Sequence, residues 1–352
     1  MEDNLRSDCK VQSTGRFVWE MDATEGYMLA NSLFQNLASM DIVETELTLW
    51  FPKFHKKEVL DEMARILNAN SPRMGGLTAT TSAWPSSPAS RIQLSFPRGG
   101  RKLELVTSAS AEGAVEATSD WVDNTLGRLG LCPHTASMEK AAIGLEGVSV
   151  KQGPVVIRES TAMFPDTLDS ISLLASFWNC VSEMATRPEQ DLATILLLAP
   201  PAYDNRFLEF AGVCDELLEP TVQATKVESV VGRAWFHPAY DAEAVGHKQI
   251  LPGHALPGRL VEKFMRQQQQ QQQQQRQQDT TRVVVPDAES IARANNAVRW
   301  SPHATVNLLR RSQLNAAKQV EAMNPNKKPN SIYARNVLRI LADDDTGGNR
   351  VQ

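Results

Sequence analysis

Cysteine is scarce in this chain, and long apolar runs are absent from it. The 352 residues include four cysteines, at positions 9, 132, 180 and 214, and no two of them form a Cys-x-x-Cys pair. A disulfide scaffold needs dense, even cysteine usage in a short secreted chain, so we expect free thiols. The longest apolar runs, such as residues 195–201, are far shorter than the roughly 20 residues of a bilayer span. We therefore expect no transmembrane helix and no membrane partner.

Basic residues are not in excess. Lysine and arginine number 36 against 41 aspartates and glutamates, which gives a net charge of −5. A general polyanion binder needs a strong basic excess, so we expect no nucleic-acid partner. The N-terminal residues include acids and lack the apolar region of a signal peptide, and transit peptides are usually poor in acids. These features predict a cytoplasmic protein, with an organellar location, for example a plastid, as the alternative.

The overall composition is that of a globular protein. Apolar residues make up 42% of the chain and charged residues 22%. These fractions exclude a fully disordered chain, a collagen-like fibre and a coiled-coil rod. The length is sufficient for two domains, or for one large domain with tails. Residues 1–16 and 346–352 are polar and predict flexible tails.

Residues 17–110 predict a small α+β domain. The apolar spacing indicates strands at 17–21 and 45–51 and helices at 27–40 and 56–67. Two further apolar runs, 91–96 and 102–106, flank a Pro-Arg-Gly-Gly sequence and predict a β-hairpin. Residues 75–90 are rich in glycine, threonine, serine and proline, so we expect a loop there.

Residues 111–345 predict a larger α/β domain in which strands and helices alternate. The apolar runs indicate strands at 154–158, 193–199 and 230–236 and helices at 114–129, 168–184 and 206–218. This order predicts a short sheet with a βαβαβ core covered by helices, so the fold class of the chain is α+β. Right-handed crossovers make neighbouring strands parallel, unless a split arrangement inserts one strand between them.

Two helices are expected near the C-terminus, after a glutamine tract. Residues 267–275 are nine consecutive glutamines. Such a tract cannot bury apolar surface, so residues 266–282 predict a disordered insertion, and we interpret it as a tolerated loop expansion rather than an interaction segment. A helix is expected at 301–319, with Ser301 as its N-cap and Pro302 at its first position. The last helix is expected at 331–341.

Common catalytic and nucleotide-binding motifs are absent, but two short segments carry reactive side chains at the ends of predicted elements. Neither the dinucleotide and phosphate-loop glycine motifs nor the zinc-protease, hydrolase and EF-hand motifs occur. Cys132 with His237 would make a nucleophile and its base if the fold brings them together. With His134 or His303, the same side chains would suit zinc or iron. Neither spacing is specific, so we assign no metal site, and structural roles in packing and hydrogen bonding remain the alternative.

The C-terminal residues 299–350 are locally basic, with nine lysines and arginines against four acids. Arg310 and Arg311 could clamp a phosphate or a carboxylate with two hydrogen bonds. A solvated basic face is the alternative interpretation of this charge.

Residues 118–342 resemble the domain of unknown function 1415 family in several short motifs. The matching residues are Trp121, Leu131-Cys132-Pro133, Phe236-His237-Pro238 with Tyr240, Ser301-Pro302 with Leu308-Leu309-Arg310, and Ile332-Tyr333-Ala334-Arg335-Asn336. The family's aromatic residue after Cys-Pro is His134 here, its His before Leu-Leu is Asn307, and its Glu after the Arg is Arg311. The family has no established activity, so the resemblance implies a shared pocket of Cys132, His237, Ser301 and Arg310 but names no reaction, and the cofactor stays unknown.

Two functional hypotheses follow. The first is a ligand-binding or regulatory protein with a small anionic ligand, and the missing glutamate favours it. The second is an enzyme in which Cys132 is the nucleophile or a metal ligand and His237 is the base or a metal ligand. In that enzyme Arg310, Ser301 and Tyr240 would bind a small anionic substrate.

Overall fold

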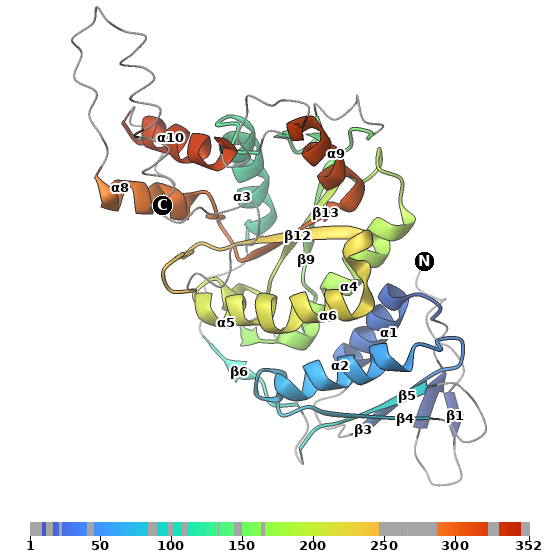
Figure 1. Cartoon of the computed structure of the whole chain (residues 1–352). Coiled ribbons are helices and arrows are strands. Elements are labelled where there is room, and N and C mark those ends of the chain that lie inside the picture. Colours follow the sequence, from blue (N-terminus) through green and yellow to red (C-terminus); the bar gives the residue numbers. More distant parts are fainter. Residues whose placement is uncertain are drawn as a thin grey trace, which may run out of the picture. The chain divides into compact units, whose positions relative to one another are not determined.

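The computed structural model shows helices and several small sheets (Figure 1), which confirms the predicted α+β class. It describes residues 9–11, 17–20, 23–40, 46–83, 90–97, 101–106, 112–132, 134–143, 150–162, 166–245, 266, 287–322 and 331–345. Apart from Arg266, the predicted glutamine-rich insertion lies outside the described residues, as does the predicted tail at 346–352. No helix of the described part of the chain is both long and apolar enough to cross a membrane.

Contacts within the chain define two compact units, each built from separate stretches of sequence. The first unit comprises Met1–Ser110, Arg158–Pro188 and Leu197–Gly232. The second unit comprises Ala111–Ile157, Glu189–Leu196 and Arg233–Gln352. Residues 158–188 and 197–232 therefore group with the N-terminal third of the chain. The division into domains 17–110 and 111–345 stays a prediction.

Five strands form the main sheet of the first unit, in the order β1–β2–β3–β5–β4. The strands are β1 (Cys9–Val11), β2 (Phe17–Glu20), β3 (Glu46–Phe51), β4 (Thr78–Ala83) and β5 (Ser90–Ser95). β2 and β3 pair in parallel, and the other neighbours pair antiparallel. β1 lies within the stretch predicted as an N-terminal tail. The buried face of β3 presents Leu47, Leu49 and Phe51, as expected for side chains that alternate along a strand.

The predicted hairpin of 91–96 with 102–106 is wrong, and so is the loop predicted at 75–90. β5 pairs with β3 and β4, and β4 lies inside that predicted loop. Instead of pairing with β5, β6 (Glu104–Leu105) pairs with β10 (Thr167–Leu168) in a separate two-stranded sheet. Threonine suits a strand, but the only fully buried position described in β4 is the small Ala79, so this strand lacks an apolar signal.

Two layers of helices complete the first unit. α1 (Gly26–Ser39) and α2 (Lys57–Ala69) pack against the five-stranded sheet, and Figure 1 shows α2 running across β4 and β5. α4 (Ser170–Thr186) packs along α1, and α6 (Glu219–Thr225) packs along α2. The apolar positions of α1 that share one helical face, including Leu29, Leu33 and Leu37, are fully buried, which is why this sequence forms an amphipathic helix.

Short helical segments connect these elements. They are the 3₁₀ helices η1 (Ser71–Met74), η4 (Pro201–Tyr203) and η6 (Val227–Ser229), the α-helix α5 (Phe207–Gly212) and the π-helix η5 (Val213–Leu218). α5, η5 and α6 follow one another directly, so the helix predicted at 206–218 continues to Thr225. Pro220 lies just after the junction of η5 and α6, where it has no N–H to donate to the preceding turn.

A four-stranded sheet with the order β12–β13–β11–β9 supports the second unit. The strands are β9 (Val155–Glu159), β11 (Thr194–Leu198), β12 (Val231–Phe236) and β13 (Thr305–Arg310), and the limits of the unit fall within the first three. β11 is buried at every position, as its continuous apolar run predicts. β13 lies between β11 and β12, so the simple βαβαβ core is not confirmed.

The helix predicted at 301–319 is wrong in its first half. Residues 305–310 form strand β13, and helix α9 begins only at Arg311 and ends at Ala322. Ser301 is not an N-cap, because its hydroxyl donates a 2.5 Å hydrogen bond to the carbonyl of His303. Thr305 and Val306 are β-branched and buried, and they favour the extended backbone that the central position in the sheet requires.

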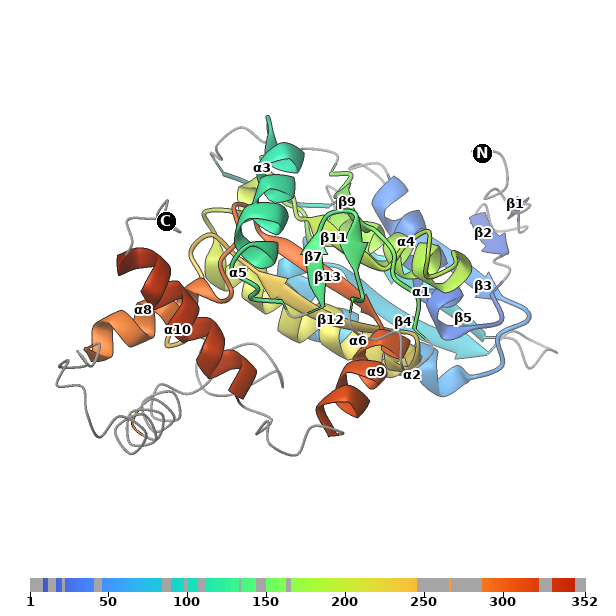
Figure 2. The same cartoon turned by 90° about the horizontal axis from the view of Figure 1, so that it is seen from above.

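Helices cover this sheet and also form a separate cluster. The helices are α3 (Ala114–Trp121), the π-helix η2 (Val122–Gly127), α8 (Ala288–Ala297) and α10 (Ser331–Asp345). Two short strands, β7 (Thr135–Ser137) and β8 (Lys140–Ala141), pair with each other. Trp121 and Val122 belong to an apolar cluster that includes side chains from β9, β11 and β12 of the four-stranded sheet. One of these side chains is Phe236, whose ring centroid is 5.2 Å from that of Trp121. α8 and α10 pack against each other (Figure 2), and their apolar faces enclose Leu131.

Gly26 provides a test of the packing between α1 and α6. A Cβ atom at this position would collide with the backbone carbonyl oxygen of Thr225. Alanine normally stabilises a helix relative to glycine, but here we expect Gly26→Ala to lower the free energy of unfolding by about 1–3 kcal/mol, because the backbone must shift. Urea unfolding followed by circular dichroism measures this change. Glu25→Ala, at an exposed neighbour, should have little effect, and a stabilised Gly26→Ala protein would contradict the packing.

Candidate functional site

Cys132 follows a glycine-terminated helix end. Gly130 has a φ of 59°, and the Leu131 and Gly130 amides donate to the Leu126 and Gly127 carbonyls at 3.0 Å each. This is a Schellman motif, and glycine suits its left-handed position. Leu131 is buried in the cluster of α8 and α10, whereas Cys132 is a half-buried free thiol. The sequence therefore anchors Leu131 and leaves the next residue partly accessible.

Helix α10 holds the segment before Cys132. The Asn336 side-chain amide donates a 2.6 Å hydrogen bond to the Leu131 carbonyl, and the Arg339 guanidinium donates to the Gly130 carbonyl. Arg128 and Asp343 form an ion pair with N–O distances of 3.1 and 3.3 Å. Two sequence motifs that lie far apart along the chain, Leu131-Cys132 and the one ending in Asn336, are thus in direct contact.

His237 lies at the end of β12 and is fully buried. Its backbone N–H donates to the Arg299 carbonyl at 3.1 Å, and its Nδ1 accepts from the Ala239 N–H at 2.9 Å. Because Nδ1 is an acceptor here, a neutral ring carries its proton on Nε2. The imidazole thus closes the turn that leads to Tyr240, whose N–H donates to the His237 carbonyl at 3.2 Å.

Arg299 is a buried cation that the sequence analysis did not single out. Its residue is 1% exposed, and its Cζ lies 5.3 Å from the Trp235 ring centroid and 5.4 Å from that of Tyr240. Nη1 also donates to the Trp235 carbonyl at 3.4 Å. Cation–π contacts of this kind stabilise a desolvated guanidinium. In the sequence, the one feature that pointed to a buried cation was the group of aromatic residues around His237-Pro238.

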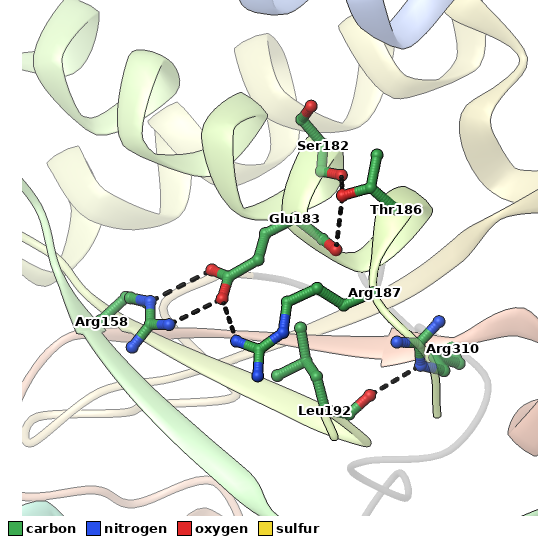
Figure 3. A network of polar contacts seen from close by, with 7 residues as sticks. All are labelled: Arg158, Ser182, Glu183, Thr186, Arg187, Leu192 and Arg310. Atoms are coloured by element: carbon green, nitrogen blue, oxygen red, sulfur yellow. Dashed lines mark hydrogen bonds and ion pairs between the residues drawn. The ribbon is translucent and has the colours of Figure 1, made fainter. Parts of the chain in front are cut away.

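Ser301 and Arg310 are both engaged with backbone carbonyls. Ser301 is fully buried against the His303 carbonyl, and the Arg310 Nε donates to the Leu192 carbonyl at 2.8 Å (Figure 3). Arg310 is the last residue of β13, so this bond fixes the strand end to the residues before β11. These contacts give both side chains structural roles.

The structure brings together some of the predicted site residues. His237 and Tyr240 share one turn around Arg299, whereas Cys132 lies beside α10. No hydrogen bond among the described residues joins the Cys132 thiol to His237. The described residues also contain no cluster of three or more His, Cys, Asp or Glu side chains placed to hold a metal. The catalytic pairing of Cys132 with His237 stays a prediction.

Cys180 and Cys214 are buried free thiols in the first unit. Burial raises the pKa of the Cys180 thiol to about 12, and the neighbouring Glu183 carboxylate adds to this rise. A thiol with so high a pKa is unreactive at neutral pH. Among these three thiols, Cys132 is therefore the most accessible to reagents.

Glu183 anchors a polar network on α4 (Figure 3). Its carboxylate accepts from the Arg158 Nη2 at 2.6 Å and Nε at 3.1 Å, and from the Arg187 Nη1 at 2.7 Å. Burial disfavours the charged carboxylate, but the hydrogen bonds from Arg158 and Arg187 outweigh it, so the pKa of Glu183 lies below its ordinary value. The arrangement is structural, because it ties β9 to α4 within the first unit.

The first unit contains a pocket of about 550 Å³. Four stretches of the first unit form its walls. The lining residues are Pro72, Arg73, Gly75, Gly76, Pro97, Lys102, Leu103, Glu104, Leu168, Tyr203, Glu209 and Val213. Val213 is the first residue of the π-helix η5, and such helices occur often at functional sites. Sequence analysis treated these segments as a loop, a hairpin and a helix and did not connect them.

Two glycines shape one wall of this pocket. Gly75 and Gly76 have φ values of 66° and 85°, which favour glycine. A Cβ at Gly75 would lie 2.7 Å from the Lys102 carbonyl oxygen, and one at Gly76 would lie 2.9 Å from the Pro97 ring. The glycine pair therefore allows Pro97 and Lys102 to approach the end of η1 closely. A Gly-Gly sequence next to a Pro-Arg-Met turn was the one local signal of this wall.

The acidic side chains around the pocket are paired. Arg206 binds Glu104 at 2.6 Å and Glu209 at 3.2 Å, while Arg73 binds Glu216 at 2.5 Å. All these pairs are partly exposed, so each contributes little to stability. They do neutralise the carboxylates that face the pocket.

A buried ion pair lies behind the pocket wall. The Arg101 Nη2 is 3.4 Å from the Asp169 Oδ2, and both side chains are 1% exposed. Asp169 also caps α4, because its Oδ1 accepts from the Ser172 N–H at 3.0 Å. Tyr203 lines the pocket and is 1% exposed. Burial raises the pKa of its phenol, and the nearby Asp169 carboxylate raises this pKa further. Tyr203 therefore stays protonated at neutral pH.

Comparison with known proteins identified one family. Residues 113–250 match the model of a family described as "Protein of unknown function (DUF1415)". This range includes Cys132, His237 and Tyr240 of the predicted site, and Tyr203 and Glu209 of the pocket. The comparisons with curated proteins and with solved structures found no match.

The contact between Asn336 and Leu131 predicts how accessible Cys132 is. Asn336→Asp keeps the size of the side chain but places an oxygen against the Leu131 carbonyl. We expect a loss of about 1–3 kcal/mol in the free energy of unfolding, because a buried hydrogen bond becomes a repulsion. We also expect faster alkylation of Cys132, measured by mass spectrometry with Cys132→Ser as the reference. Unchanged stability and labelling would show that α10 does not hold this segment.

The Glu183 network predicts a pH dependence of stability. Since the pKa of Glu183 is lower in the folded protein, its contribution is complete above the ordinary value of 4.5 and is lost as the pH falls through the folded value. Glu183→Gln should therefore lower the unfolding free energy by about 1 kcal/mol at neutral pH. The difference from the wild type should vanish in acid, as followed by urea unfolding at several pH values. Glu139→Gln, at an exposed turn, serves as the control, and a pH-independent difference would refute the role of Glu183.

Proposed function

Because residues 113–250 belong to the family of unknown function DUF1415, whose description names no reaction and no ligand, we propose a function from the geometry of the first unit. The protein binds a small organic molecule in the pocket between η1, residues 102–104 and α5. The single observation that carries this proposal is the pocket itself, with a volume of about 550 Å³.

The size and the lining of the pocket support a small-molecule site. Ligand pockets usually enclose about 300–1,000 Å³ and combine apolar walls with a few placed polar groups. Here Leu103, Leu168 and Val213 supply apolar surface, while Arg73 and Lys102 supply charge. A flat face between proteins would not need a pocket of this volume.

Binding, rather than catalysis, agrees best with the side chains at the pocket. Neither cysteine nor histidine occurs among its described lining residues. Its two glutamates are held by Arg206, and its tyrosine is buried, so none is presented as a nucleophile or a ready base. The pocket therefore favours the ligand-binding hypothesis over the enzyme hypothesis built on Cys132 and His237.

A pair of leucine variants tests this function. Leu103 lines the pocket, whereas Leu105 is 78% exposed and does not. We expect some members of a library of small organic acids, alcohols and amides to raise the unfolding temperature of the wild type and of Leu105→Trp. A ligand at 100 times its Kd stabilises by about 2.7 kcal/mol. Leu103→Trp fills the pocket and should abolish the effect.

Two results would refute the proposal. One is a library in which no compound stabilises the wild type. The other is equal stabilisation of the wild type and of a folded Leu103→Trp protein, because the ligand would then bind elsewhere.

A further inference from the structure

We infer that the ligand carries an oxyanion, a carboxylate or a phosphate, which Lys102 binds at the pocket. This inference rests on the proposed function, because it names the class of molecule that the pocket accepts. Two observations support it. The glutamates at the pocket are paired with arginines, whereas Lys102 and Arg101 have hydrogen-bond donors without partners among the described residues.

The carboxylates at the pocket are already paired with arginines. Glu104 and Glu209 share Arg206, and the nearby Glu216 is bound by Arg73. A cationic ligand would have to displace an arginine from one of these pairs. The acidic side chains therefore do not favour a cationic ligand.

Two cations retain hydrogen-bonding capacity. Lys102 is exposed at the pocket and makes no ion pair with any residue that the structure describes. Arg101, the preceding residue, is 3% exposed, and its Nε and Nη1 have no hydrogen-bond partner within the described part of the chain. Buried donors without partners are costly, and a guanidinium is normally satisfied by oxygens.

Asp169 does not complete the hydrogen bonding of Arg101. Its only contact with the guanidinium is 3.4 Å long, and its two oxygens already accept from Ser172, at 3.0 Å from the N–H and 2.5 Å from the hydroxyl. The Arg101 Cγ lies 3.3 Å from the place of a Cβ on Gly75, which lines the pocket. The Arg101 side chain therefore starts behind the wall at Gly75, and its buried positive charge adds to the charge of Lys102.

The apolar walls define the rest of the ligand. Leu103, Leu168 and Val213 would contact a hydrocarbon or aromatic body, while Lys102 would bind the oxyanion. A small organic acid or a phosphate monoester has this combination. Sulfate or phosphate alone would leave the apolar surface uncovered.

Matched probes test this inference. Benzoate and benzamide have the same shape and differ in charge, and phenyl phosphate replaces the carboxylate by a phosphate. Isothermal titration at low salt should show binding of benzoate or phenyl phosphate that is at least about tenfold tighter than binding of benzamide. Added salt should weaken the binding of both anions and leave the binding of benzamide unchanged, because salt screens interactions between exposed charges. The tighter of the two anions identifies the oxyanion.

Two lysine variants separate the contribution of Lys102 from general charge effects. Lys102→Gln should weaken binding of the anion by at least about tenfold, the size of one lost charged hydrogen bond, and should not change binding of benzamide. Lys56→Gln removes an exposed lysine that does not line the pocket and should change nothing.

The contrary outcomes distinguish the two levels of the argument. Benzamide that binds as tightly as benzoate, and is excluded by Leu103→Trp, would overturn the anion inference but leave the pocket as a binding site. Anions that bind Leu103→Trp and the wild type equally would overturn the pocket as well. Failure of both anions to bind the wild type would overturn the inference directly.

Discussion

The buried ion pair of Arg101 and Asp169 is the constraint on which the first unit depends. Asp169 caps α4, and Arg101 begins the segment that continues into Lys102 and the pocket wall. Removing one partner of a buried pair leaves an uncompensated charge, at a cost of about 3–5 kcal/mol. The start of a core helix and the position of a pocket wall are thus fixed by one interaction. Arg101 thus links this structural role to the wall of the pocket for which we propose ligand binding.

In the second unit, the corresponding constraint is the satisfaction of backbone carbonyls by side chains. Asn336 and Arg339 bind the carbonyls after η2, and Arg310 binds the carbonyl of Leu192. Arg299 is enclosed by two aromatic rings beside the turn that His237 closes. Several residues that appeared to be candidates for chemistry therefore act as polar supports of the fold. The free thiol of Cys132, in contrast, is only half-buried.

Elements with a strong local pattern were predicted well. The apolar run of β11 and the amphipathic spacing of α1 and α2 are visible in a few consecutive residues, because burial selects side chains with a period of two or about 3.6. β4 and β13 were missed for opposite reasons. The threonine-rich β4 has little apolar signal, and β13 follows a Ser-Pro sequence that is typical of a helix start. Their extended conformation is stabilised by neighbouring strands that lie far away in the sequence.

The amino-acid sequence by itself determined the α+β class, the family of residues 113–250 and most helices, because these depend on local spacing and short motifs. Only the tertiary structure decided the insertion of β13 between β11 and β12, and the contact of Asn336 with Leu131. It alone also revealed the pocket, whose lining runs from Pro72 to Val213. A pocket has no sequence pattern of its own, because its walls are joined by chain folding and by ion pairs such as Arg206 with Glu104. The partners of a side chain depend on distance in space, which no local spacing records.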